Sequence, residues 1–281
     1  SDIAENEVQD HSMAEVEVFD DSNQNMMMTV PSEEATEPKE EGYLGSVQQL
    51  LEGSDVVTIA LPNSEAQFTV PITFIVPKGE SSTLELVNDL AEKINYEEWG
   101  LLPSPLTELT FKESSYNETE KKVIIDVPLP GLESLSSAEV TMLKQSIQET
   151  FLALGYKYVE LTTEGEPGVI LGPLQEEGFA LQEMNRGYYL YKTGTGHQLL
   201  VRGAAVSAPM ENANGQPFTF LETIEQMKVG NQEIGYEATI PSDVSIIDIR
   251  EQGQLLTLVF PPETTFDDND QTRVMIDAIL F

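Results

Sequence analysis

Short stretches of alternating or continuous apolar residues recur along this chain, and Pro, Gly or Asn closes each of them, as expected of β-strands. Between them lie segments with apolar residues every three or four positions, which indicates one face of a helix. In the first half, strands are predicted at residues 56–61, 71–76, 109–111, 123–127 and 156–161, and helices at 84–94 and 137–154. The predicted order is therefore ββαββαβ.

The second half repeats this order without the last strand. Strands are predicted at residues 188–192, 198–202, 244–250 and 255–260, one helix begins after Thr219, and another follows the acidic run at 267–270. Ser82 with Glu85 and Thr219 with Glu222 both have the capping-box spacing that starts a helix. The matching order and caps predict an internal duplication.

The predicted fold class is α+β, with two tandem ββαββα(β) units. We expect mainly antiparallel or mixed sheets with helices packed on one face. The division along the chain follows from composition: residues 1–54 form an acidic, disordered spacer, 55–164 the first domain, 165–187 a connector rich in glycine, and 188–281 the second domain. Because a helical pattern runs to Phe281, we expect the second domain to be truncated at its C-terminus.

Charge narrows the set of binding partners. The 281 residues include 49 acidic and 14 basic ones, for a formal net charge of −35. Such a field repels nucleic acid and anionic lipid, so we expect no nucleic-acid partner, and contact with a membrane only through an anchor outside this chain. There is no cysteine, which excludes disulfides and thiolate chemistry. No apolar run approaches the ~20 residues that span a bilayer.

The search for reactive residues identifies no catalytic, cofactor-binding or metal-binding set, and no cofactor is expected. His11 lies in the acidic spacer, and His197 lies at a hairpin turn without another histidine nearby in sequence. The acidic run at 267–270 lacks the glycine and distal glutamate of a calcium loop, so we interpret it as a helix cap. The tyrosines at 188–191 and Trp99 are interpreted as strand and core residues. The chain is therefore predicted not to be an enzyme.

The order of these elements resembles the GerM-type domain of sporulation and germination proteins, present twice. A closer resemblance rests on an ordered series of short motifs. The series resembles the outer portion of anti-sigma-X factors and consists of Gly168–Gly172 (GVILG), Gly187–Tyr191 (GYYLY), Phe218–Glu222 (FTFLE), Leu255–Phe260 (LLTLVF) and the Asp-rich cap before Val274.

This resemblance implies a function. Anti-sigma-X factors are membrane-anchored negative regulators of an extracytoplasmic-function sigma factor in Gram-positive bacteria. The chain would be their sensor module on the outer face of the cell membrane, with the sigma factor bound by a cytoplasmic domain that this chain lacks, and with an envelope protein or protease as a further partner. The alternative is a GerM-like envelope or spore lipoprotein that binds a cell-wall component. A hydrolase would instead require two facing acids of raised pKa in a deep pocket.

Overall fold

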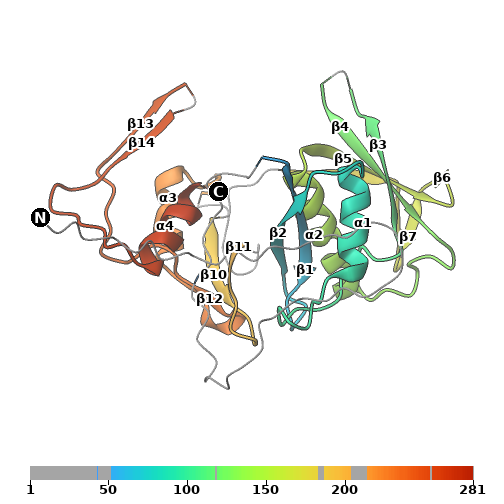
Figure 1. Cartoon of the computed structure of the whole chain (residues 1–281), viewed down its shortest axis with the longest axis horizontal. Coiled ribbons are helices and arrows are strands. Elements are labelled where there is room, and N and C mark those ends of the chain that lie inside the picture. The colour runs from blue at the N-terminus through green and yellow to red at the C-terminus, as the bar shows by residue number, and fades with distance from the viewer. Residues whose placement is uncertain are drawn as a thin grey trace, which may run out of the picture.

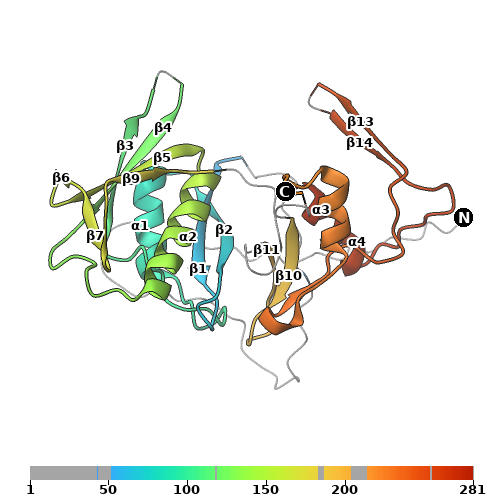
Figure 2. The ribbon, with the colours of Figure 1, turned by 180° about the vertical axis from the view of Figure 1, so that it is seen from behind.

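The computed structural model describes residues 43, 52–117, 119–182, 187–203, 214–253 and 255–280. The described elements form two units side by side (Figures 1 and 2). In each unit, helices lie between a small sheet near the middle of the molecule and a hairpin on the outside. The two central sheets face each other, with β2 of the first unit beside β11 of the second. Apart from Tyr43 and residues 52–54, the predicted acidic spacer lies outside the described residues.

The first unit is built from two hairpins, two helices and a final strand. Its central hairpin pairs β1 with β2 in antiparallel register from Ser54↔Pro77 to Pro62↔Thr69. Its outer sheet is mixed, because β4 pairs antiparallel with β3 and parallel with β5. The elements are β1 (Ser54–Pro62), β2 (Thr69–Pro77), α1 (Thr83–Lys93), β3 (Thr110–Ser115), β4 (Lys121–Val127), α2 (Ser137–Ala153) and β5 (Tyr156–Thr163).

Helix α2 covers the free edge of β1. The Ala60 amide donates a hydrogen bond to Thr150 Oγ1 at 3.0 Å, and the Ser146 hydroxyl donates to the Ala60 carbonyl oxygen. Both hydroxyl residues are fully buried, one helical turn apart. A buried strand edge would otherwise carry unpaired backbone groups at a substantial energetic cost. Two small polar residues in an otherwise apolar helix face therefore join the helix layer to the central hairpin.

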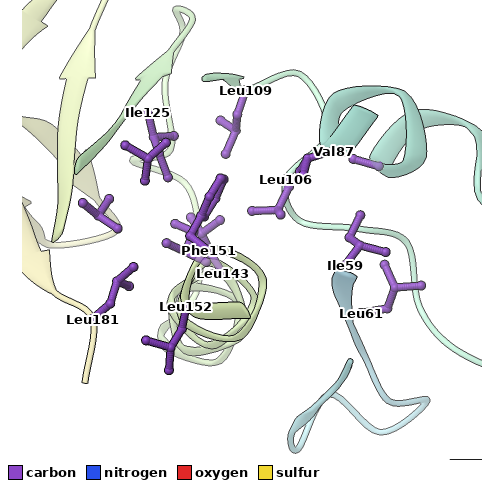
Figure 3. Close-up of a cluster of buried hydrophobic side chains, with 14 of the residues drawn as sticks. Ile59, Leu61, Val87, Leu106, Leu109, Ile125, Leu143, Phe151, Leu152 and Leu181 are labelled. Carbon is purple, nitrogen blue, oxygen red and sulfur yellow. The ribbon is translucent and has the colours of Figure 1, made fainter. Parts of the chain in front are cut away.

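Residues 165–181, within the range predicted as a connector, form four short strands: β6 (Glu166–Pro167), β7 (Val169–Leu171), β8 (Leu174–Glu176) and β9 (Gly178–Ala180). Both β6 and β9 pair with β5. Gly178 adopts φ +153°, and a Cβ atom there would lie 2.2 Å from the Val159 carbonyl oxygen, so only glycine allows this close approach. Leu181 then packs into the first core beside Leu152 (Figure 3).

The second unit repeats the order of elements of the first unit but is smaller. Its central sheet has the order β11-β10-β12, and its outer hairpin pairs β13 with β14. The elements are β10 (Tyr188–Lys192), β11 (Gln198–Arg202), α3 (Phe220–Met227), the 3-10 helix η1 (Gln232–Ile234), β12 (Tyr236–Glu237), β13 (Asp248–Gln252), β14 (Leu255–Val259) and α4 (Asp270–Leu280). The predicted α+β class and tandem arrangement are confirmed.

The main error in the second unit concerns the strand predicted at 244–250. The structure begins β13 at Asp248. Val244 instead closes a turn through a hydrogen bond from its amide to the Pro241 carbonyl oxygen and is buried in the second core. The first part of the apolar run at 244–250 therefore packs in the core, and only its last part forms a strand. The periodicity of the sequence does not distinguish these two parts.

Candidate functional site, the joint between the two units

One contact region joins the units, and we call it the joint. It is made by Phe68, Trp99, Gly100 and Glu149 of the first unit and by Tyr191, Thr195, His197, Arg202 and Tyr236 of the second. The buried core of the first unit runs through the joint without a break and includes Tyr189, Tyr191 and Tyr236. The units therefore share hydrophobic core in addition to their covalent link.

Phe68 is the centre of the joint. The buried Asn63 side chain accepts hydrogen bonds from the backbone amides of Gln67 and Phe68, at 2.7 and 3.2 Å, and so fixes the turn that presents the ring. The Phe68 ring meets Tyr191 edge-on, with 5.1 Å between the ring centroids, and meets Tyr236 similarly at 4.7 Å. Edge-to-face pairs of this kind add about 0.5–1.5 kcal/mol beyond the burial of their area.

A second contact closes one end of the joint. The Trp99 ring lies against the His197 ring, with a centroid separation of 4.6 Å, and Nδ1 of His197 lies 3.0 Å from Thr195 Oγ1. Gly100 adopts φ +65°, and a Cβ atom there would lie 3.1 Å from that same hydroxyl oxygen. Glycine is therefore required here for both its left-handed backbone and its small size.

An ion pair lies at the opposite side of the interface. Arg202 Nη1 is 3.6 Å from Glu149 Oε2, and the two side chains are only 20% and 10% exposed. The guanidinium also donates to the Tyr188 hydroxyl at 3.0 Å. A mostly buried pair adds little net stability, but removing one partner leaves a desolvated charge behind. The pair therefore favours one relative placement of the two units.

Burial raises the pKa of Tyr189, next to the joint, to about 12. Elsewhere in the first unit, the Tyr156 hydroxyl donates to Glu113 at 2.8 Å. This hydrogen bond is the main reason why the pKa of Glu113 is lowered, while burial followed by the same bond raises the pKa of Tyr156. Both phenols therefore stay protonated at neutral pH.

A separate hollow of about 300 Å³ lies where β4 and β5 end. Its lining includes the apolar residues Leu129 and Ile170, the Thr163 hydroxyl and the side chains of Glu133 and Gln175. In open sheets, ligands favour the crevice beyond the carboxyl ends of parallel strands. The hollow has the position of a ligand site, but its lining contains one acid and no basic residue to work with it.

The structure places the aromatic, histidine and acidic residues noted in the sequence as follows. Tyr189 and Tyr191 are buried on one face of β10, as predicted. Trp99 is half-buried against the first core. His197 lies at the predicted hairpin turn, where it is half-buried and its ring contacts that of Trp99. Asn269 Oδ1 accepts from the Thr272 amide at 2.9 Å, which agrees with the capping interpretation of the acidic run. His11 lies outside the described residues.

Across the part of the chain that the structure describes, no three His, Asp or Glu side chains are grouped so that they could hold a metal ion. Among the same residues, no helix is long and apolar enough to cross a membrane.

The chain is similar in structure to the tandem GerMN domains of the sporulation protein GerM from Bacillus subtilis, with a TM-score of 0.51 and 15% identity over 74% of this chain and 79% of that one. Residues 47–177 match the sequence model of the anti-sigma-X factor RsiX central domain. No curated protein matches. Together, the two matches confirm the resemblance to anti-sigma-X factors built of tandem GerM-like units.

The two comparisons cover different parts of the molecule. The RsiX match ends at residue 177, so it includes the first unit and the β6–β8 segment. The similarity to tandem GerMN domains spans more of the chain and concerns the fold alone. The likeness to anti-sigma-X factors therefore rests on the first unit, and the tandem arrangement rests on the fold of both units.

Proposed function

We propose that this chain is the extracytoplasmic sensor module of a membrane-anchored anti-sigma factor that negatively regulates an extracytoplasmic-function sigma factor in a Gram-positive bacterium. The observation that carries the proposal is the match of residues 47–177 to the RsiX central domain. The sigma factor would be held by a cytoplasmic domain, and an envelope protein or protease would act on the module. The module itself would be non-enzymatic.

In this proposal, the domains keep the predicted extents of 55–164 and 188–281, with residues 1–54 as the spacer and 165–187 as the connector. The joint supplies a physical route for signalling. Phe68, Tyr191 and Tyr236 are buried and contact one another across the joint, so separating the units would expose part of their surface. A partner that binds better to the separated units would shift the module toward that state. Exposure of the joint, or the changed distance between the two units, would then be the signal that is passed to the membrane anchor.

The test is genetic. Deleting the gene that encodes this chain should raise transcription from promoters of the cognate sigma factor, and the full-length gene should restore repression. A full-length gene with Phe68→Ala should change the level of repression, because it loosens the joint. The matched control, Val229→Ala, alters an apolar side chain that is 67% exposed and should behave as wild type. Unchanged transcription of every extracytoplasmic-function regulon after deletion would refute the proposal.

A second candidate, a GerM-like lipoprotein that binds a cell-wall component, is favoured by one observation, the hollow at the ends of β4 and β5. It predicts that soluble peptidoglycan fragments bind this chain and that Ile170→Trp, which would fill the hollow, abolishes binding. Leu256→Trp, which introduces the same side chain at an exposed position far along the sequence, is the control. Absence of binding in isothermal calorimetry removes this candidate.

A further inference from the structure

Helix α4 of the second unit carries a buried acid, Asp277. This residue is only 6% exposed, and among the residues that the structure describes it is the one charged residue that is buried. Its neighbours Met275 and Ala278 pack in the second core. A carboxylate buried beside apolar side chains is costly unless hydrogen-bond donors reach it. The position of Asp277 therefore requires a donor.

One donor comes from the opposite end of the chain. The Tyr43 hydroxyl donates a hydrogen bond of 2.9 Å to Asp277 Oδ2, between residues that are 234 positions apart. Tyr43 is half-buried. Burial, followed by this hydrogen bond, raises the pKa of its phenol. The phenol therefore keeps its proton at neutral pH and remains the donor.

The two units use the buried polar residues of these helices differently. In α2, Ser146 and Thr150 form hydrogen bonds with Ala60 of β1, within the first unit. In α4, Asp277 accepts instead from a residue that precedes the first unit in the chain. The contact with Tyr43 therefore attaches another part of the chain to the second unit.

Only a short stretch of chain connects Tyr43 to the first unit. The amide of Lys78, which follows β2, donates to the Gly53 carbonyl oxygen at 2.7 Å, and β1 begins at Ser54. Figure 1 shows α4 and β1 in different units, so residues 43 and 53 are held on different units. Since an extended chain covers about 3.5 Å per residue, this stretch limits how far the units can move apart while both of its ends stay attached.

We propose that Tyr43 and Asp277 form a latch, which fastens the chain ahead of the first unit to the second unit and helps to keep the joint closed. While the joint is closed, Tyr43 stays near Asp277 at a high effective concentration, and opening the joint lowers that concentration. By linkage, loss of the latch weakens the joint in turn. A pull on the chain before Tyr43 would load α4 before it loads β1. The proposal goes beyond the regulatory role and does not depend on it.

The rate of chymotrypsin cleavage after Tyr43 tests the latch. The protease needs a freed aromatic side chain, so this rate reports how often the latch opens. Mass spectrometry should show the cut to be at least about ten-fold slower in the whole chain than in a synthetic peptide of residues 39–47. Tyr43→Phe keeps an aromatic side chain for the protease but removes the donor. Measured against its own peptide, this variant should be cut about ten-fold faster than wild type.

Two substitutions of acids near the end of the chain are compared. Asp277→Leu removes the acceptor without leaving a buried charge behind and should accelerate the cut as much as Tyr43→Phe does. Adding Tyr43→Phe to Asp277→Leu should give little further increase, because both changes break the same hydrogen bond. Asp267→Leu, the same change at an exposed position before α4, should leave the rate at that of wild type.

The joint provides the reciprocal test. Phe68→Ala should accelerate the cut after Tyr43, although the substitution lies in the first unit. Ile147→Ala, at a buried position of the first core outside the joint, should accelerate it less. Equal acceleration by both variants would show that general loss of stability frees Tyr43, and no acceleration by Phe68→Ala would show that latch and joint are independent. Either result would overturn the proposal.

Two further results would also overturn the proposal. Cleavage of the wild-type chain as fast as that of the peptide would show that Tyr43 is not held. An unchanged rate in Tyr43→Phe would show that the hydrogen bond to Asp277 is not what protects Tyr43, and this result does not depend on whether Asp277→Leu folds.

Discussion

The two units follow the same order of elements but differ in how far their cores are completed. In the first, the strand after α2 returns to pair with β4, and the chain then adds β6 and β9 to that strand. In the second, α4 packs against β10, and within the described residues β14 pairs with β13 alone. Within the described residues, β4 is therefore paired on both sides and β14 on one side.

The two units also differ in the size of their hydrophobic cores. The large core of the first unit extends through the joint to Tyr236, while the second unit has a separate small core around Met227 and Met275. The second unit therefore buries part of its apolar side chains against the first unit.

The largest expected effect comes from breaking the joint. Phe68→Ala removes a ring that is 2% exposed, and Phe→Ala substitutions in cores cost about 3–5 kcal/mol of unfolding free energy. Because the ring contacts both Tyr191 and Tyr236, its loss should also separate the unfolding of the two units. Calorimetry should show two transitions where the wild type shows one. A single transition at a lower temperature would contradict the coupling.

A matched pair of substitutions compares the two cores. Ile147 in α2 and Ile224 in α3 are both nearly fully buried. Replacing either with alanine should lower the free energy of unfolding by about 2–5 kcal/mol. The loss should be larger for Ile147→Ala, because the larger first core is less able to collapse around the cavity. Urea denaturation measures both. A larger loss for Ile224→Ala would show that the second core is the tighter one.

Helix caps should behave alike in the two units. Ser136 Oγ accepts from the Glu139 amide, and Thr219 Oγ1 accepts from the Glu222 amide, each at 3.3 Å. Ser136→Ala and Thr219→Ala should each cost about 1 kcal/mol, measured by urea denaturation. Ser137→Ala, one position past the first cap, is the control and should have a much smaller effect. A strong asymmetry between the two caps would mean that the helices contribute unequally.

The smallest expected effect is a pH dependence confined to the first unit. The Tyr156 hydrogen bond holds the pKa of Glu113 below its ordinary value of 4.5. Its stabilisation is therefore present above pH 4.5 and is lost as pH falls through the lower folded value. The raised pKa of Tyr156 acts in the opposite direction: its stabilisation holds below the ordinary value of 10.0 and is lost as pH rises through the folded value.

Tyr156→Phe checks this pair. The difference in unfolding free energy between wild type and variant should shrink as the solution is acidified below pH 4.5, because the protonated Glu113 no longer favours the phenol as its donor. Lys112→Ala, in the neighbouring exposed part of β3, should leave the acid dependence unchanged. A wild-type-minus-Tyr156→Phe difference that stays constant from pH 3 to pH 7 would contradict the assignment.

Much of the fold could be predicted from the sequence, because strand runs, helical stripes and capping boxes are local signals. The boundaries of β10 and β11 and the capping boxes at Ser82 and Thr219 agree with the local patterns. The buried hydroxyls of Ser146 and Thr150 could not be found this way, since they satisfy an edge that is 86 or more residues away. The pairing of β9 with β5 is likewise visible only after folding.

The joint was the part that sequence reasoning missed most. Phe68, Trp99 and His197 are separated by long stretches, and no local pattern links a turn before β2 to a hairpin turn in the other unit. One signal was available in hindsight: the glycines around Thr195 and Gly100 mark turns that come close together. Long-range contacts of this kind follow from tertiary packing, which a single sequence does not report.

Native-state hydrogen exchange of β4 and β14 tests the contrast between the units most directly. Paired on both sides, the amides of Lys121–Val127 should exchange slowly, at rates set by unfolding of the first unit. In the given chain, Leu255–Val259 is paired on one side only within the described residues, so its alternate amides should exchange orders of magnitude faster at the same pH and temperature. Equal, strong protection of both strands would contradict this difference in strand pairing between the two units.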